Sequence, residues 1–117
     1  MPHLHLEYSD NLKQLDVEKT LLRLNHTLVG SGQFAQELDI KARAQAFAHV
    51  RVGVAPVDRA FASIRLALLS GRSAEVKRQL SSSLLEVLKD AVHEASGLEV
   101  QLSVEVIDMD RDSYVKV

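Results

Sequence analysis

The apolar residues of this 117-residue chain follow one order of periodicities, and the order occurs twice. They recur first every second residue, then every three or four residues, and then every second residue again. A period of two is typical of a half-buried strand, and a period near 3.6 is typical of an amphipathic helix. The sequence therefore predicts strand, helix, strand, repeated once. We expect one domain over 1–117, with pseudo-repeats over about 1–57 and 58–117.

The first unit has a short strand, a capped helix and a longer alternating segment. Alternating apolar residues predict a strand over about Pro2–Tyr8. Asp16 is placed to cap a helix whose apolar positions lie between Val17 and Leu28, and the glycines around Ser31 end it. Alternation returns over Ala42–Val54, where we favour a strand, although its alanine-rich part also suits a helix.

The second unit repeats this order with clearer signals. Arg59–Leu69 alternates as a strand, and Ser73 is placed to cap the helix that follows. The apolar face of that helix extends from Val76 to Ala95, and Ser96-Gly97 ends it. Leu98–Val106 then alternates strictly and is the clearest strand of the chain.

Two strand-helix-strand units of this kind predict an α+β fold. Each unit requires a parallel crossover, which is almost always right-handed. We therefore expect one four-stranded mixed sheet with both helices packed on one face. We expect the uncovered face to be apolar or mixed, with Phe47, His49 and the small alanines on it, and hence a homo-oligomer that buries it.

Composition narrows the classes of function. The net charge is −2, only 4% of the residues are aromatic and tryptophan is absent, so we expect no nucleic-acid partner. No apolar run approaches the ~20 residues that span a bilayer, and we see no signal peptide. The chain has no cysteine, which fits a reducing compartment. We therefore expect a cytoplasmic protein without membrane contact.

Pro2 is the residue with the most distinctive chemistry. A small residue at position two favours removal of Met1, which would turn the Pro2 nitrogen from an amide into a free secondary amine. An α-amino group titrates near pH ~8, and burial or nearby cations lower that value. Such an amine could take a proton from carbon near neutral pH. The alternative is that Pro2 merely starts the first strand.

Four short motifs occur together in a fixed order. They are Met1-Pro2-His3, Glu7-x-Ser9-Asp10-Asn11, Ile40-x-x-Arg43 and Gly71-Arg72-Ser73. With the duplicated pattern, they resemble the tautomerase superfamily, and within it the 5-carboxymethyl-2-hydroxymuconate isomerase family. The resemblance covers nearly the whole chain. It implies a tautomerase-like fold, a homotrimer, and an isomerase of aromatic-compound breakdown that uses neither metal nor organic cofactor.

The resemblance also implies roles for individual residues. Pro2 would carry a proton between carbons of a 2-hydroxymuconate-like dienol carboxylate. Arg72 would bind a substrate carboxylate, since a guanidinium holds it by two parallel hydrogen bonds; the alternative is a solvated loop arginine. Lys41 and Arg43 would assist, with surface ion pairs as their alternative. The family pattern has arginine where this chain has Lys41, which keeps the charge but loses the bidentate fork.

Other readings remain open at this stage. His3 and His5 share a strand face, but two ligands are too few for a metal site, and we interpret them as ordinary strand histidines. The departure at Lys41 keeps open a related enzyme with different chemistry, such as a hydratase or a dehalogenase. A third reading is a non-enzymatic oligomeric interaction protein on the same scaffold.

Overall fold

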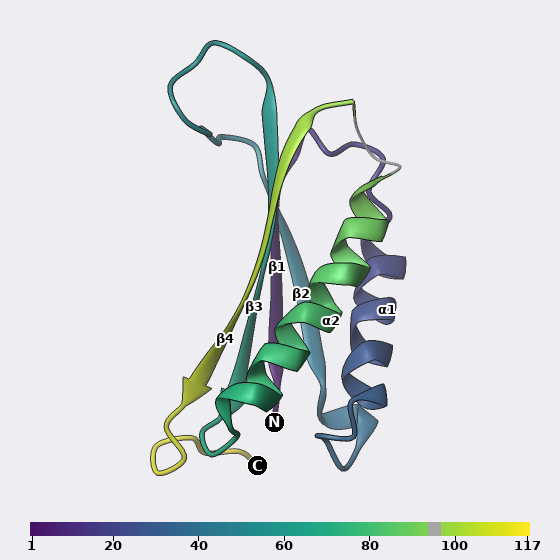
Figure 1. Cartoon of the computed structure of the whole chain (residues 1–117). Helices are drawn as coiled ribbons and strands as arrows, with labels where there is room; N and C mark the ends of the chain where they lie inside the picture. The colour runs from purple at the N-terminus through teal and green to yellow at the C-terminus, as the bar shows by residue number, and fades with distance from the viewer. Residues whose placement is uncertain (94–96) are drawn as a thin grey trace.

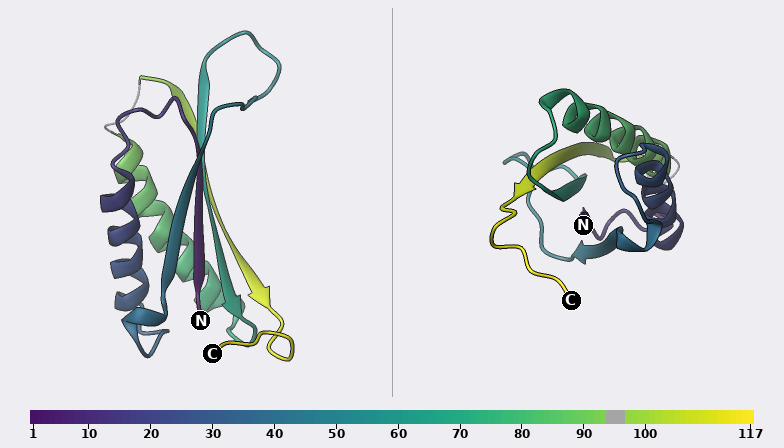
Figure 2. Two further views of the ribbon diagram at one scale, coloured as in Figure 1. Left: turned by 180° about the vertical axis from the view of Figure 1, so that it is seen from behind. Right: turned by 90° about the horizontal axis from the view of Figure 1, so that it is seen from below.

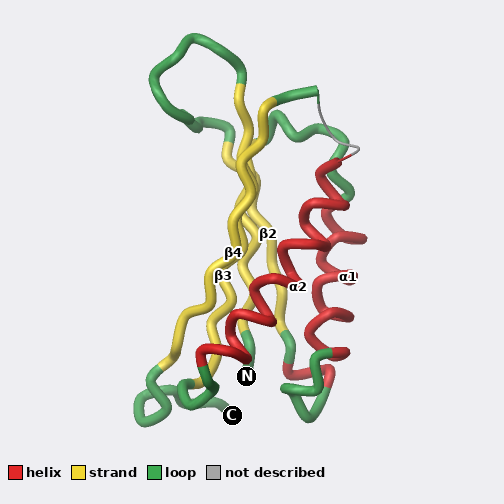
Figure 3. The backbone as a smooth tube through the Cα atoms, viewed as in Figure 1, coloured by secondary structure: helices red, strands yellow, loops and turns green. Residues whose placement is uncertain are grey.

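Four strands form one sheet in the order β2-β1-β3-β4, with two helices on one face (Figures 1 and 3). The computed structural model describes residues 1–93 and 97–117. The elements of these residues, in chain order, are β1 (His3–Ser9), α1 (Val17–Gly30), a 3₁₀ turn η1 (Glu37–Asp39), β2 (Lys41–Phe47), β3 (Arg59–Leu69), α2 (Ala74–His93) and β4 (Glu99–Met109). The predicted strand-helix-strand duplication is confirmed.

The sheet is mixed, as predicted. β1 runs parallel to β2 and β3 runs parallel to β4, so each half contains the parallel crossover expected of it. β1 and β3 run antiparallel to each other and join the halves. The strand that starts the chain therefore lies inside the sheet, between β2 and β3.

The core lies between the sheet and the two helices. Alternate side chains of β1 and β3 point toward the helices, which present leucines spaced by four residues in return. Aliphatic side chains dominate, because the sequence supplies few aromatic residues. The core side chains with at most 1% exposure are Leu4, Leu6, Leu24, Leu28, Ala60, Ala62, Ile64, Leu66, Leu68, Leu84 and Leu88.

Both predicted helix caps are confirmed. The carboxylate of Asp16 accepts a hydrogen bond from the backbone nitrogen of Lys19 at 3.1 Å. The hydroxyl of Ser73 accepts one from the backbone nitrogen of Val76 at 3.2 Å. These bonds satisfy donors that the first helical turn leaves unpaired. The predicted end of the second helix at Ala95 and Ser96 lies outside the described residues. Neither helix of the described residues is long and apolar enough to cross a membrane.

The strand predicted over Ala42–Val54 is wrong in its second half. β2 ends at Phe47, which pairs with Ser9, the last residue of β1. Because β2 lies at the edge of the sheet, the backbone beyond Phe47 has no neighbouring strand to pair with. Residues 48–58 instead form the long loop at the top of Figure 1, where Gly53 adopts the left-handed φ of 70° that glycine tolerates best.

The uncovered face of the sheet is mixed, as expected, because Phe47, Phe61 and Ile107 share it with polar side chains. The expectation that the small alanines and His49 lie on it is wrong. Ala42 and Ala44 pair with Leu4 and Leu6 and so lie on the helix side, while His49 belongs to the loop after β2. The opposite alternation also carries polar and charged side chains. One row across the sheet consists of Arg43, His5, Arg65 and Glu105.

Leu24 and Leu22 of α1 provide a matched test of this core. Leu24 is 0% exposed and Leu22 is 59% exposed. We expect Leu24→Ala to lower the free energy of unfolding by about 2–5 kcal/mol, because it leaves a cavity in the core. Leu22→Ala should lower it by less than about 1 kcal/mol. Urea unfolding at one fixed protein concentration measures both, and equal losses would contradict the described orientation of α1.

Candidate active site

Several distant segments meet at the end of the sheet where β1 begins. Figure 1 places the N-terminus, the C-terminus, the turn before α2 and the start of β2 at this end, and the view from below in Figure 2 shows the N-terminus among them. Pro2 is fully buried. Its carbonyl accepts a hydrogen bond from the backbone nitrogen of Lys41 at 3.2 Å. Pairing of β1 with β2 therefore begins at the predicted catalytic residue.

The terminal amine, which here belongs to Met1, lies in a cationic environment. Burial lowers its pKa; Asp39 raises it, and Arg72, Lys41 and Lys116 lower it further, with a net lowering from the usual value of 8.0. Two of the predicted substrate-binding residues, Arg72 and Lys41, are thus close enough to act on this charge. With Met1 in place the Pro2 nitrogen is an amide, and removal of Met1 would leave the amine on Pro2.

Arg72 is held in the turn between β3 and α2. Its Nη2 donates to the carbonyl of Gln33 at 2.8 Å, and its Nε donates to the side-chain oxygen of Gln33 at 3.3 Å. The guanidinium carbon lies 4.9 Å from the centre of the Phe34 ring, in cation–π geometry. Arg72 is half-buried and packed against the loop after α1, so it differs from the freely solvated loop arginine that was its alternative.

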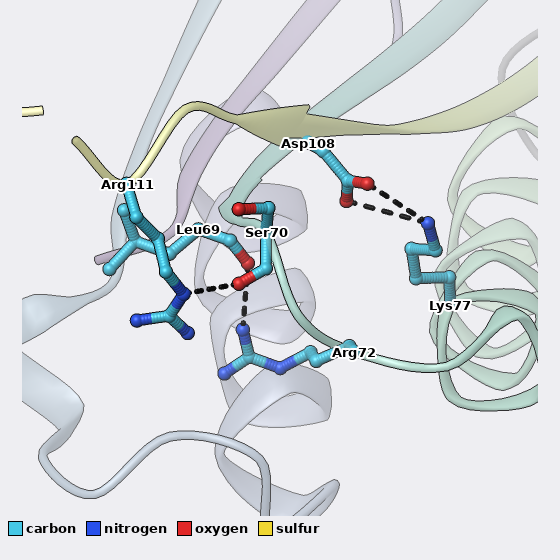
Figure 4. A network of polar contacts seen from close by, with 6 residues as sticks. All are labelled: Leu69, Ser70, Arg72, Lys77, Asp108 and Arg111. Atoms are coloured by element: carbon cyan, nitrogen blue, oxygen red, sulfur yellow. Dashed lines mark hydrogen bonds and ion pairs between the residues drawn. The ribbon is translucent and has the colours of Figure 1, made fainter. Parts of the chain in front are cut away.

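Hydrogen bonds and an ion pair hold the turn that carries Arg72. Figure 4 shows Arg72 donating to the carbonyl of Leu69 and Arg111 donating to the carbonyl of Ser70. Lys77, in the first turns of α2, pairs with Asp108 of β4 at 3.2 Å. These contacts hold the turn between β3 and α2, and with it the guanidinium of Arg72, in one position.

Lys41 and Arg43 lie on the uncovered face of β2, opposite His3 and His5 of β1. The Nζ of Lys41 donates to the carbonyl of Asp39 at 3.2 Å, which keeps the ammonium near the terminal amine. Arg43 lies two residues further along β2, and its Nη2 is 2.8 Å from Nδ1 of His3. Within residues 1–93 and 97–117, neither cation forms an ion pair with a carboxylate, in contrast to the surface-pair alternative.

His3 has partners on both ring nitrogens, which an ordinary surface histidine lacks. Its Nε2 lies 3.0 Å from the hydroxyl oxygen of Tyr114 in the C-terminal tail, opposite the contact with Arg43. Burial lowers the pKa of His3, and Arg43, Lys41, His5 and the terminal amine lower it further. In the part of the chain that the structure describes, no three His, Asp or Glu side chains gather as a metal site.

Sequence reasoning did not identify several side chains at this end of the sheet. Gln33 and Phe34 hold Arg72, while Tyr114 and Lys116 come from the polar C-terminal tail. Phe34 follows a glycine-rich turn, which is a weak signal. The tail has no periodicity, so nothing in its residues indicated that it folds back to His3.

The family model for 5-carboxymethyl-2-hydroxymuconate isomerase matches residues 2–117. The crystal structure of a 5-carboxymethyl-2-hydroxymuconate isomerase from Deinococcus radiodurans R1 is 30% identical, with a TM-score of 0.91 over 99% of this chain and 88% of that chain. A search of curated protein sequences finds no match.

More distant structures share the fold. A 5-carboxymethyl-2-hydroxymuconate delta-isomerase is 18% identical, with a TM-score of 0.77 over 100% of this chain and 87% of that chain. A symmetric trimer of wild-type fused 4-OT is 20% identical, with a TM-score of 0.77 over 98% of this chain and 91% of that chain. The tautomerase-like fold expected from the sequence is confirmed. The chain belongs to the 5-carboxymethyl-2-hydroxymuconate isomerase family and is an isomerase of the tautomerase type.

Proposed function

We propose that this isomerase moves a proton between carbons of a 2-hydroxymuconate-like carboxylate, with the Pro2 nitrogen as the base. The observation that carries the proposal is the position of Pro2, which is buried beside Lys41. The amine of the preceding Met1 has its pKa lowered by burial and by the cations Arg72, Lys41 and Lys116, against the opposing effect of Asp39. A neutral amine accepts a proton, and a base works best when its pKa lies near the working pH. The proposal requires removal of Met1.

The proposed reaction neither adds nor removes atoms. From the keto form, the amine takes a proton from one carbon, and the electron pair of the broken C–H bond moves through the conjugated system onto the carbonyl oxygen. From the dienol form, the amine takes the hydroxyl proton and reaches the same dienolate. The resulting dienolate then takes the same proton back from the ammonium at another carbon. The substrate itself holds the negative charge between the two steps, so the proposal needs neither metal nor organic cofactor.

Arg72, Lys41 and Arg43 are the proposed anchors for the substrate's carboxylates and its developing oxyanion. Fixed donors aimed at a developing charge stabilise the transition state without reorganising during the reaction. Arg72 and Arg43 meet this requirement best, because hydrogen bonds to Gln33 and His3 hold their guanidinium groups. Lys41 contributes a single point charge at the position where the family pattern has arginine.

We further propose a homotrimer that works in the breakdown of aromatic compounds. The symmetric trimer of fused 4-OT supports the assembly. The mixed uncovered face of the sheet supports it too, because it offers another copy both apolar side chains, such as Phe61 and Ile107, and charged ones, such as Arg43. The family supports the metabolic role, because the substrate in its name is a 2-hydroxymuconate, the type of acid that cleavage of an aromatic ring yields.

Pro2→Ala tests the proposed base, and Pro56→Ala is its matched control. Pro2 and Pro56 are the two prolines of the chain, and Pro56 is exposed in the loop after β2. We expect Pro2→Ala to lower kcat/KM for ketonisation of a 2-hydroxymuconate-type dienol by about a hundredfold or more. Pro56→Ala should leave it unchanged. Intact mass spectrometry on the same preparations reports whether Met1 has been removed.

Two results would contradict the proposed base. One is a Pro2→Ala variant as active as wild type, and the other is full activity in a preparation whose mass retains Met1. A processed wild type that is inactive on the dienol would instead favour different chemistry on this scaffold, such as hydration or dehalogenation, or a role in interaction alone.

Arg72 is tested against Arg78, an exposed arginine of α2 that pairs with Glu75. We expect Arg72→Ala to lower kcat/KM by about tenfold to a hundredfold, because a hydrogen bond to a charged group is worth about 1.5–3 kcal/mol. Arg72→Lys should lose less, since it keeps the charge. Arg78→Ala should match wild type. Steady-state kinetics with urea unfolding of each variant checks this, and an unchanged kcat/KM in Arg72→Ala would exclude the anchor.

A further inference from the structure

The C-terminal tail, residues 110–117, folds back across the end of the sheet at which the chain begins (Figures 1 and 2). A turn starts it, with the backbone nitrogen of Tyr114 donating to the carbonyl of Asp110 at 3.1 Å. Two side chains of the tail then contact the rest of the protein. The hydroxyl of Tyr114 contacts His3, and the ammonium of Lys116 pairs with Asp39 at 3.4 Å. The tail is therefore joined to β1 and to the entry of β2.

The contacts of His3 fix the direction of its hydrogen bonds. An arginine side chain only donates, so the Nδ1 that lies 2.8 Å from Arg43 must be the unprotonated acceptor. The ring proton of neutral His3 is then on Nε2, which donates to the hydroxyl oxygen of Tyr114 at 3.0 Å. The two rings meet edge to face, with centroids 6.0 Å apart. Arg43 therefore selects this tautomer, and the hydroxyl of Tyr114 holds the Nε2 side of the ring in place.

We propose that Tyr114 is a positioning residue of the active site, which acts through His3 to hold the guanidinium of Arg43 where it meets a substrate carboxylate. The proposal rests on the proposed function of Arg43 as an anchor. Arg43 is exposed, and a long exposed side chain samples many rotamers unless a partner restrains it. His3 is that partner, and Tyr114 holds His3 from the other side.

Protonation of His3 would undo this arrangement. An imidazolium donates from both nitrogens, so it cannot accept from Arg43 and it repels the guanidinium. The groups that face His3 are Arg43 and Lys41 from β2, His5 from β1, the terminal amine, and Tyr114 from the tail. Burial and these cations hold the pKa of His3 below its usual value of 6.5, so His3 is neutral at pH 7 and accepts.

Tyr114→Phe tests the proposal, and Tyr8→Phe is its matched control. Tyr8 is the other tyrosine of the chain and packs against the core. Both substitutions remove one hydroxyl and keep the ring. We expect Tyr114→Phe to raise KM by about threefold to tenfold, the size of one hydrogen bond, with kcat almost unchanged. Tyr8→Phe should leave both constants at their wild-type values.

Double substitution with His3→Asn separates action through His3 from independent action. The amide oxygen of asparagine still accepts from Arg43, but its short side chain does not reach Tyr114. If Tyr114 acts through His3, adding Tyr114→Phe to His3→Asn should change KM no further. Multiplication of the two effects in the double variant would overturn the proposal, and so would a wild-type KM in Tyr114→Phe alone.

Nitrogen-15 NMR of the His3 ring gives a readout that loss of packing would not mimic. Wild type at pH 7 should carry its proton on Nε2. Tyr114→Phe should show a mixture of the two tautomers, because a ring released by Tyr114 no longer keeps Nδ1 against Arg43. Wild-type KM should rise as the pH falls through the lowered pKa of His3, because the acceptor for Arg43 is lost there. A protonated Nδ1 in wild type, or a KM independent of pH between 7 and the pKa measured for His3, would overturn the proposal.

Arg43→Ala distinguishes failure of this proposal from failure of the proposed function. If Arg43→Ala raises KM and Tyr114→Phe does not, then Arg43 is an anchor and only the positioning role of Tyr114 is wrong. If Arg43→Ala leaves KM unchanged, then the anchoring role of Arg43 is wrong, and the positioning role fails with it. Activity that survives Pro2→Ala would contradict the proposed base independently of both results.

Discussion

Strand β1 carries the start of the chain into the middle of the sheet, because it pairs with β2 on one side and with β3 on the other. Everything at the candidate site depends on this double pairing. Pro2 is buried where β1 begins, and the backbone bond from Lys41 to its carbonyl aligns β2 beside it. If β1 lay at the edge of the sheet, Pro2 would be exposed to solvent on one side, and only one neighbouring strand would place cations near it.

The charges at this end of the sheet differ from those of the whole chain. The chain has a net charge of −2, yet Arg72, Lys41 and Lys116 all act on the terminal amine. Asp39 is the opposing charge, and it pairs with Lys116 at 3.4 Å. Nearby positive charge disfavours the protonated form of the amine and attracts an anionic substrate. Burial, Arg43 and Lys41 lower the pKa of His3, so that at pH 7 its ring is neutral and can accept from Arg43.

Regular alternation made most of the fold predictable from the sequence. β3 has the predicted bounds, and the bounds of β1 and α1 differ from the predicted ones by a residue or two. These elements were predictable because each buries one face, and the spacing of its apolar residues shows which face that is. The end of β2 was not predictable in this way, since Ala48–Val54 alternates as well as the strand before it. What stops β2 is the end of its partner β1, and that is a property of the pairing and not of the local residues.

The candidate site was predictable only where topology brings its parts together. A parallel crossover returns β2 to the start of β1, and this places Lys41 beside Pro2. The contact between His3 and Tyr114 joins residues 111 positions apart, and no repeat or spacing connects them. His3 therefore looked like an ordinary strand histidine until its two partners were known.

The most direct test of the account is a titration of the Pro2 nitrogen by NMR, with nitrogen-15 proline incorporated into the protein. Pro56, the other proline, is an internal amide and gives a reference signal that does not titrate. The account predicts that the Pro2 nitrogen titrates as a free amine, with a pKa below the value of about 8 that is usual for an α-amino group. A Pro2 nitrogen that does not titrate, or that titrates above that value, would contradict the account.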